Sequence, residues 1–277
     1  MPGVFELLKR GWELYVKNVR SYYIFILLFL AASLVVNFIS TLYGPTIGTL
    51  LAKNWDELAS FSLIAIPLFI ILFYLELTVL SALNTRLENR SVNVSEALVG
   101  TVRRLPSALG AYVISVLPTL AGSLLLISLG VGIGKDAFRA PEFSISTAVI
   151  IGIIAGFVLL IVGIALLFWL FFSHLEALLA GKGPLAAIAA SYRIVRGRWW
   201  ALFGRILGTA IIISTVVYLI NSILDWVTVD AIMVAVFKAG EEAQSIVKLI
   251  SSTVLGVLVA PWGYGITMIL YKTMRGS

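Results

Sequence analysis

The sequence predicts an all-α integral membrane protein with six transmembrane helices, and three observations lead to this fold class. Of its 277 residues, 60% are hydrophobic and 12% are charged, whereas a soluble domain has about 45–50% apolar and about 25% charged residues. The charged residues are clustered, and the apolar stretches between the clusters reach the roughly 18 residues that a membrane-spanning helix needs. An amphipathic segment followed by a long apolar one occurs three times.

The three copies of this pattern begin alike. FELLKRGWELYVKN opens the first, SEALVGTVRRLPSAL the second and LAAIAASYRIVRGRWW the third, so that Leu8, Leu98 and Ile188 lie 90 residues apart. We expect a single polytopic membrane domain made of repeats over residues 1–91, 92–181 and 182–277. Each repeat would consist of a cytosolic amphipathic in-plane helix followed by a transmembrane hairpin.

Residues 1–20 predict an amphipathic helix beside the membrane. One face carries charges that step by three or four residues, and the opposite face is apolar and includes Trp12. The charged face consists of Glu6, Lys9, Arg10, Glu13, Lys17 and Arg20. This pattern is typical of an in-plane interfacial helix. A helix packed on the cytosolic surface of its own protein would show the same pattern, and the sequence leaves both interpretations open.

The apolar stretches between the charge clusters define the six spans. We expect them at residues 22–43, 60–83, 105–129, 143–179, 199–223 and 246–271. The fourth is too long for a perpendicular crossing at about 1.5 Å per residue, so we expect it to tilt or to emerge from the membrane. Asn93 and Glu96 form a capping-box pattern before the second amphipathic helix. Pro184, after two glycines, predicts the start of the third.

The distribution of basic residues predicts the orientation. Of the 20 Lys and Arg residues, five (Lys53, Lys135, Arg139, Lys238 and Lys248) lie at one set of span ends, which leaves 15 at the other. The positive-inside rule therefore places both termini in the cytoplasm of a cell that carries the protein in its cytoplasmic membrane. The same distribution explains the net charge of +6 without nucleic-acid binding.

Polar residues inside the spans are candidates for a functional site, namely Asn37, Glu76, His174 and Glu176. A charged side chain at mid-membrane costs about 2.5–3.5 kcal/mol on insertion scales, so each acid should face the bundle interior or water. The two acids could bind a cation, relay protons or form structural ion pairs, for example with Arg193 or Arg205. The third repeat has no acid at the corresponding position, and the polar groups nearest to that position are Tyr264 and Thr267.

A second candidate surface is basic and aromatic. In the third repeat, three arginines run directly into Trp199 and Trp200. Such a surface could bind anionic lipid headgroups, or it could set topology through positive charge and an aromatic belt. The predicted interface comprises Trp12, Arg103, Arg104, Arg193, Arg196, Arg198, Trp199 and Trp200.

The residue types argue against a catalytic or metal site. The chain has no cysteine and one histidine, His174. A metal site needs convergent ligands, and residues two apart on a helix, such as His174 and Glu176, do not face together. The glycine-rich run from Gly130 to Lys135 departs from the phosphate-loop spacing. We therefore expect no cofactor, no metal and no catalytic residue.

Three stretches are similar to a known group of membrane proteins. ELLKRGWELYVKN, LAGKGPLAAIAASYRIVRGRWWALFGRIL and APWGYGITMILYKTMR resemble the membrane-domain superfamily found with some glycerophosphodiester phosphodiesterases. That superfamily includes stand-alone six-span proteins of bacteria and archaea with no assigned function. The resemblance implies the six-span architecture but not the hydrolase activity, because the catalytic domain of those enzymes is a separate barrel.

These features together predict a non-enzymatic membrane protein. The leading hypothesis is that it binds, and translocates, a lipid-like or small amphipathic molecule, with membrane lipids as its partners. The alternative is a structural or accessory subunit that scaffolds another membrane complex. In that case the in-plane helices would dock onto a membrane-protein partner or onto a second copy of the chain.

Overall fold

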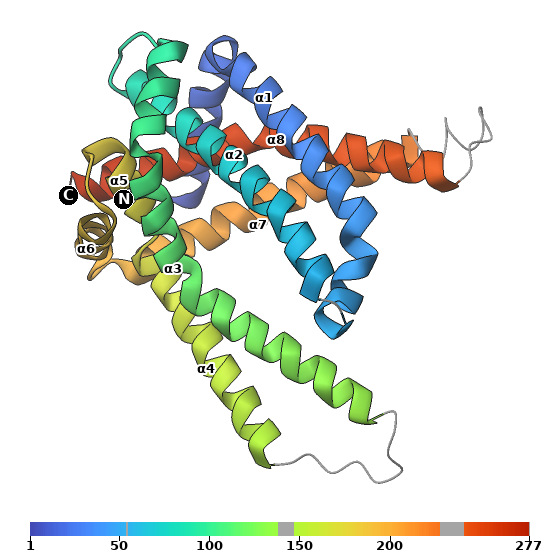
Figure 1. The fold of residues 1–277 in the computed structure, drawn as a ribbon. Coiled ribbons are helices and arrows are strands. Elements are labelled where there is room, and N and C mark those ends of the chain that lie inside the picture. The colour runs from blue at the N-terminus through green and yellow to red at the C-terminus, as the bar shows by residue number, and fades with distance from the viewer. Residues whose placement is uncertain (54, 138–146, 228–240, 277) are drawn as a thin grey trace. The chain divides into compact units, whose positions relative to one another are not determined.

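The computed structural model describes residues 1–53, 55–137, 147–227 and 241–276, and their regular structure is helical throughout (Figure 1). The helices are α1 (Val4–Lys53), α2 (Trp55–Leu87), α3 (Val94–Ala137), α4 (Thr147–Trp169), α5 (Ser173–Ala180), α6 (Pro184–Val195), α7 (Trp199–Leu224) and α8 (Glu241–Arg275). The all-α prediction is confirmed for this part of the chain.

Five stretches of the described chain are long and apolar enough to cross a membrane. They are Ala65–Leu87, Val94–Leu126, Ile150–Ala180, Trp199–Val227 and Gln244–Arg275. They correspond to the second to sixth predicted spans. The first predicted span is represented by a shorter apolar stretch, Ile26–Val35. Helix lengths and composition are therefore those of a multi-pass membrane protein.

The first two amphipathic segments are not separate helices. The prediction placed a break between each of them and the following span, but α1 and α3 each run through that position without interruption. A change from polar to apolar side chains leaves the backbone hydrogen bonds of a helix intact, so a change in composition alone does not end it. Even Pro106 lies inside α3. The predicted loop at residues 44–59 is likewise helical up to Lys53 and from Trp55 onward.

The third amphipathic segment is a separate helix, as predicted. α6 begins at Pro184 and ends at Val195, and α7 begins at Trp199. Gly197 between them has φ +79°, a left-handed conformation that a side chain disfavours. Asn93 also caps α3 as predicted, because its side-chain oxygen accepts hydrogen bonds from the backbone N–H groups of Ser95 at 3.1 Å and Glu96 at 3.4 Å.

The described chain divides into two compact units. Unit 1 comprises Met1–Thr46, Ala59–Thr101 and Phe203–Ser277, and unit 2 comprises Ile47–Leu58 and Val102–Leu202. Helices α1, α2, α3 and α7 contribute to both units.

The core of unit 1 is built around a close approach of α1 and α8. A Cβ atom on Gly11 would lie 2.7 Å from Ile266 Cγ1, and one on Gly265 would lie 3.3 Å from the Gly11 carbonyl oxygen. The indole of Trp262 donates a hydrogen bond to the Leu8 carbonyl oxygen at 2.9 Å. Beside this contact the buried side chains of α1 are Leu7, Leu8 and Tyr15. Two glycines therefore allow the backbones of α1 and α8 to meet.

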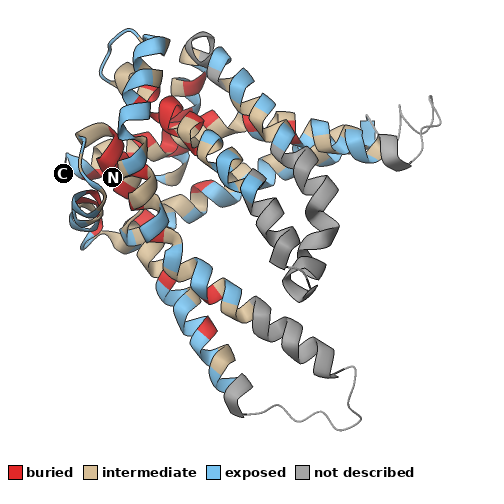
Figure 2. Cartoon of the chain, in the orientation of Figure 1, coloured by how far each residue is buried: buried red, intermediate tan, exposed pale blue. Residues whose placement is uncertain are grey.

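Unit 2 contains a hairpin of α3 and α4, which lie side by side (Figure 1). Gly163 approaches the backbone of Thr119, and Gly122 approaches that of Leu160, so close that a Cβ atom would fall 2.5 Å and 2.6 Å away. The outward apolar side chains of α4, such as Ile154 and Ile161, are exposed (Figure 2). In a bilayer these side chains would face lipid.

The long fourth span is broken rather than straight. α4 ends at Trp169, and α5 begins at Ser173. The buried hydroxyl of Ser191 in α6 bridges the break: it accepts a hydrogen bond from Phe172 N and donates one to Trp169 O, both at 3.1 Å. A side chain thus satisfies backbone groups that the interrupted helix leaves open, which is the condition for breaking a helix at membrane depth.

Candidate functional site

Glu76 lies in the middle of α2, inside the candidate span Ala65–Leu87, and its side chain is half-buried. Tyr264 of α8 lies within electrostatic range of this carboxylate. The same tyrosine packs against buried residues of α2, namely Val79, Ala82 and Leu83. Among the residues that the structure describes, no Lys or Arg forms an ion pair with Glu76. Unit 1 thus holds a carboxylate and a phenol together among apolar side chains.

Glu176, by contrast, has a cationic partner. It is fully buried in α5, and its Oε2 lies 2.5 Å from Lys182 Nζ. The sequence suggested Arg193 or Arg205 as partners, and the structure shows Lys182 in this role. The side chain of Arg205 instead donates from Nε to the Pro2 carbonyl oxygen at 2.7 Å. The contacts of Glu176 are those of a structural ion pair.

A second cation, the guanidinium of Arg104, lies at the C-terminal end of α5. The guanidinium of Arg104 donates a hydrogen bond to the Leu178 carbonyl oxygen, and a cation at this end is favoured by the helix dipole. Gly181 ends the helix with φ +65°. Arg104, which the sequence placed at a lipid interface, therefore supports α5, although it is exposed like its neighbour Arg103.

His174 takes part in packing between α5 and α3. Its ring lies edge-on to that of Tyr112, with the centroids 6.4 Å apart. Next to it, the buried hydroxyls of Ser115 and Ser173 are 3.1 Å apart. Asn37, the remaining member of the predicted polar set, belongs to α1, and its side chain lies outside the described residues.

The part of the predicted basic and aromatic surface that belongs to the third repeat lies at the end of α6, at the start of α7 and between them. Trp199 is anchored, because its indole donates a hydrogen bond to Ala165 O at 3.4 Å and its ring lies 6.0 Å from that of Phe168. Trp200 keeps 76% of its surface exposed. The nearby Arg193 and Arg196 are exposed as well, and Arg198 is half-buried. An exposed tryptophan beside arginines is typical of a membrane interface.

The N-terminal part of α1 has two apolar faces. One face is buried against the protein and includes Leu7 and Tyr15, so the helix does pack on its own protein, as the second interpretation expects. Another stripe, with Phe5, Trp12 and Val16, is exposed. This stripe is what the first interpretation, contact with the membrane interface, requires.

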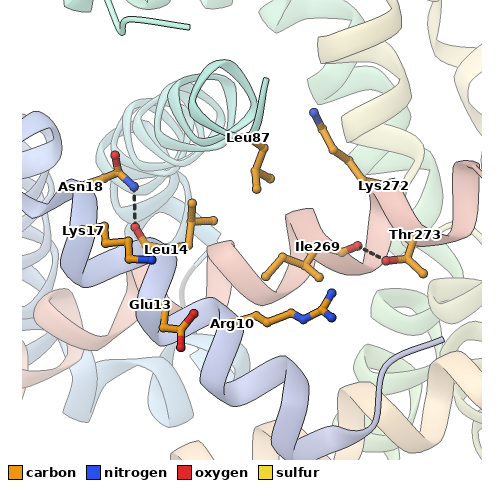
Figure 3. Close-up of a pocket in the computed structure, with 9 residues that line it drawn as sticks. All are labelled: Arg10, Glu13, Leu14, Lys17, Asn18, Leu87, Ile269, Lys272 and Thr273. Carbon is orange, nitrogen blue, oxygen red and sulfur yellow. Dashed lines mark hydrogen bonds between the residues drawn. The ribbon is translucent and has the colours of Figure 1, made fainter. Parts of the chain in front are cut away.

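Unit 1 also contains a pocket that sequence reasoning did not find, here called the α1–α8 pocket (Figure 3). Its volume is about 360 Å³, within the range of small-molecule sites. The lining residues are Arg10, Glu13, Leu14, Lys17 and Asn18 of α1, Leu87 of α2, and Ile269, Lys272 and Thr273 of α8. The lining thus combines three cations, one acid and three large apolar side chains.

The sequence contained part of the signal for this pocket. Arg10, Lys17 and Lys272 all belong to the basic group assigned to the cytosolic side. Their meeting depends on the approach of α1 and α8, whose contacting glycines, Gly11 and Gly265, are some 250 residues apart in the chain. Periodicity along one helix does not reveal a contact of that kind.

Among the described residues, no three His, Asp or Glu side chains gather as they would around a metal ion. Comparison of the chain with known protein families, with curated proteins and with solved structures found no match. The geometry of these sites therefore carries the functional argument. It offers a carboxylate within a candidate membrane span, an exposed basic and aromatic surface, and a basic pocket with an apolar lining.

Proposed function

We propose that this chain is a non-enzymatic, six-span protein of the cytoplasmic membrane that binds and translocates a lipid-like or small amphipathic molecule. The proposal includes a threefold repeat and cytoplasmic termini. It also places the chain with the stand-alone six-span relatives of the membrane-domain superfamily that its sequence resembles. Exposed Trp200 and the arginines near it support a lipid partner.

The carboxylate of Glu76 is the observation that carries this proposal. A charged residue in a span costs about 2.5–3.5 kcal/mol on insertion scales, and such residues usually mark substrate or proton pathways. Glu176 forms an ion pair with Lys182, so the free-energy cost of burying its carboxylate has a structural explanation. Within the described chain Glu76 has Tyr264 as a neighbour and no ion-pair partner. A polar group of a bound molecule is the partner that we propose for it.

The test compares Glu76→Gln with Glu96→Gln, a matched change at an exposed position in the first turn of α3. Native mass spectrometry of gently extracted protein would measure retained lipid, and reconstituted vesicles would measure flux of a fluorescent lipid analogue. We expect Glu76→Gln to reduce flux by about tenfold or more, the effect of losing one hydrogen bond to a charged group. Glu96→Gln should behave like the wild type.

Two results together would refute the proposal. The first is that the wild-type protein retains no lipid, and the second is that lipid flux is the same in the wild type and in Glu76→Gln. Thermal unfolding of both variants in detergent is measured alongside. A Glu76→Gln variant that unfolds at lower temperature but keeps normal flux would identify Glu76 as a structural residue.

A second candidate function, an accessory subunit that scaffolds a membrane complex, has its own observation. The span Trp199–Val227 contains an apolar stretch of 18 residues, and only 6% of that stretch is buried within the described chain. Within the described chain, no atom of a neighbouring element lies within 4 Å of the position that a Cβ on Gly204 of α7 would occupy. Such a surface can pack against a partner helix.

Chemical crosslinking in native membranes followed by mass determination would test this second candidate. A stoichiometric partner or a homo-oligomer supports it, and an uncrosslinked chain opposes it.

A further inference from the structure

We propose that the α1–α8 pocket is a binding site for the phosphate-bearing headgroup of an anionic phospholipid. This inference deepens the proposed function and rests on it for the choice of a lipid as ligand. The site itself is defined independently of Glu76, by the contact between the first and last helices of unit 1.

The charge of the lining favours an anion. Arg10 and Lys17 extend from α1 and Lys272 from α8, around the same opening (Figure 3). Against these three cations stands one acid, Glu13, so the lining carries a net charge of +2 (three minus one). A phosphate group accepts charge-assisted hydrogen bonds from Lys and Arg side chains.

The cations are available for exchange with a ligand. Arg10 is paired with Glu6 at 2.5 Å and Lys272 with Glu88 at 3.3 Å, and all four side chains are at least one-third exposed. Exposed ion pairs of this kind contribute about 0–1 kcal/mol, so a phosphate can replace the carboxylate at little cost. Lys17 forms no ion pair within the described part of the chain.

The rest of the lining favours an amphipathic ligand over a small hydrophilic one. Leu14, Leu87 and Ile269 supply apolar surface on three different helices. The polar groups beside them are directed to their own helices: Asn18 Nδ2 donates to Leu14 O, and Thr273 Oγ1 donates to Ile269 O, both at 2.8 Å (Figure 3). The glycerol and upper acyl region of a phospholipid fits an apolar wall next to a phosphate site.

The position of the pocket agrees with this ligand. It lies where α2 and α8 end, and the last turns of both helices are basic, with Arg86 in α2 and Lys272 and Arg275 in α8. The positive-inside rule assigns such ends to the cytosolic interface, where anionic headgroups lie. The same α1 segment carries the exposed stripe with Trp12, which would hold it at that interface.

The experiment uses the full chain and two matched triple variants. The pocket variant carries Arg10→Gln, Lys17→Gln and Lys272→Gln. The control variant carries Lys9→Gln, Lys248→Gln and Arg275→Gln, which removes the same charge from exposed positions outside the pocket. Native mass spectrometry with added phosphatidylglycerol or phosphatidylcholine would give the affinity of each protein for an anionic and a zwitterionic lipid.

We expect the wild type to prefer phosphatidylglycerol and the pocket variant to lose on the order of 100-fold in affinity for it. This estimate takes about fivefold for each basic residue near an anionic phosphate. The control variant should stay within about twofold of the wild type. Glu13→Gln should act in the opposite direction and bind phosphatidylglycerol more tightly, because it removes the acid of the lining.

Several outcomes would overturn the inference. Equal losses in the two triple variants would show that only overall charge matters, and an unchanged affinity in the pocket variant would show that the pocket is not the site. Inorganic phosphate serves as a second probe. Phosphate binding that depends on the pocket residues, without phosphatidylglycerol binding, would overturn the phospholipid as the ligand.

The failure of this inference is distinguishable from the failure of the proposed function. A wild type that retains lipid equally with the pocket variant, while Glu76→Gln still lowers flux, refutes the pocket and keeps the function. A wild type that retains no lipid and shows no flux refutes the function. Circular dichroism and thermal unfolding confirm that the substitutions in the two triple variants, all at positions at least partly exposed, leave the fold intact.

Discussion

The ammonium of Lys182 lies 2.5 Å from the carboxylate of Glu176, which is fully buried, while 33% of the lysine side chain is exposed. This ion pair links α5 to the turn that precedes α6. The two partners differ in their access to water, so the loss of one is not equivalent to the loss of the other.

The first prediction concerns this asymmetry. Lys182→Met leaves a buried carboxylate without its lysine partner and should lower the free energy of unfolding by about 3–5 kcal/mol. Glu176→Gln should cost less, because the lysine can turn toward solvent. The double variant Glu176→Gln/Lys182→Met should recover part of the loss. Unfolding in detergent, analysed as a double-mutant cycle, measures these differences; equal effects of the two single changes would contradict the asymmetry.

A second prediction follows from the hydroxyl that bridges the break between α4 and α5. Ser191→Ala removes both the acceptor for Phe172 N and the donor to Trp169 O, and should cost about 1–3 kcal/mol. The control is Ser222→Ala in α7, where an exposed hydroxyl donates to Tyr218 O of its own helix. That change should stay within about 0.5 kcal/mol. If both substitutions prove equally mild, Ser191 does not stabilise the break.

The third prediction compares two glycines on either side of Lys182. Gly181 ends α5 with φ +65°, whereas Gly183 precedes α6 with φ −64° and an open surrounding. Gly181→Ala should destabilise the protein by about 1–2 kcal/mol, because L-residues disfavour the left-handed region. Gly183→Ala should have little effect. Thermal unfolding of the two variants measures this difference. An unchanged unfolding temperature in Gly181→Ala would argue against the left-handed conformation of Gly181.

How much of this architecture the sequence could predict depends on the kind of signal. Local signals succeeded: Pro184 starts α6, Trp199 starts α7, and Asn93 caps α3. These residues act through the backbone of their own segment, so neighbouring residues suffice to interpret them. The all-helical fold and most of the apolar helices were predicted from composition in the same way.

Other predictions were wrong or incomplete, for different reasons. The partner of Glu176 was sought among the arginines, although Lys182 lies only six residues away, because a predicted break in the chain does not show where the side chain of Lys182 points. The α1–α8 pocket was missed because its lining combines residues from opposite ends of the chain. Breaks were expected in α1 and α3 because polarity changes there, but the hydrogen-bonded backbone continues through both positions.

The fourth prediction tests the contact that builds the pocket. Gly11→Leu places a Cβ atom where Ile266 Cγ1 is 2.7 Å away and Trp262 Cδ1 is 3.3 Å away, so α1 and α8 must move apart. Overpacking of this kind costs about 1–3 kcal/mol. The control is Gly100→Leu in α3, at an exposed position with no neighbour within 4 Å among the described residues. There the higher helix propensity of leucine should stabilise by about 0.5–1 kcal/mol.

Opposite shifts of the unfolding temperature are therefore expected from these two glycine substitutions. Because the pocket lies beside the contact of α1 with α8, Gly11→Leu should also weaken phosphatidylglycerol binding, while Gly100→Leu should not. A stabilised Gly11→Leu variant would show that α1 and α8 do not approach as closely as described, since a leucine side chain cannot occupy a space in which even its Cβ atom lies 2.7 Å from Ile266.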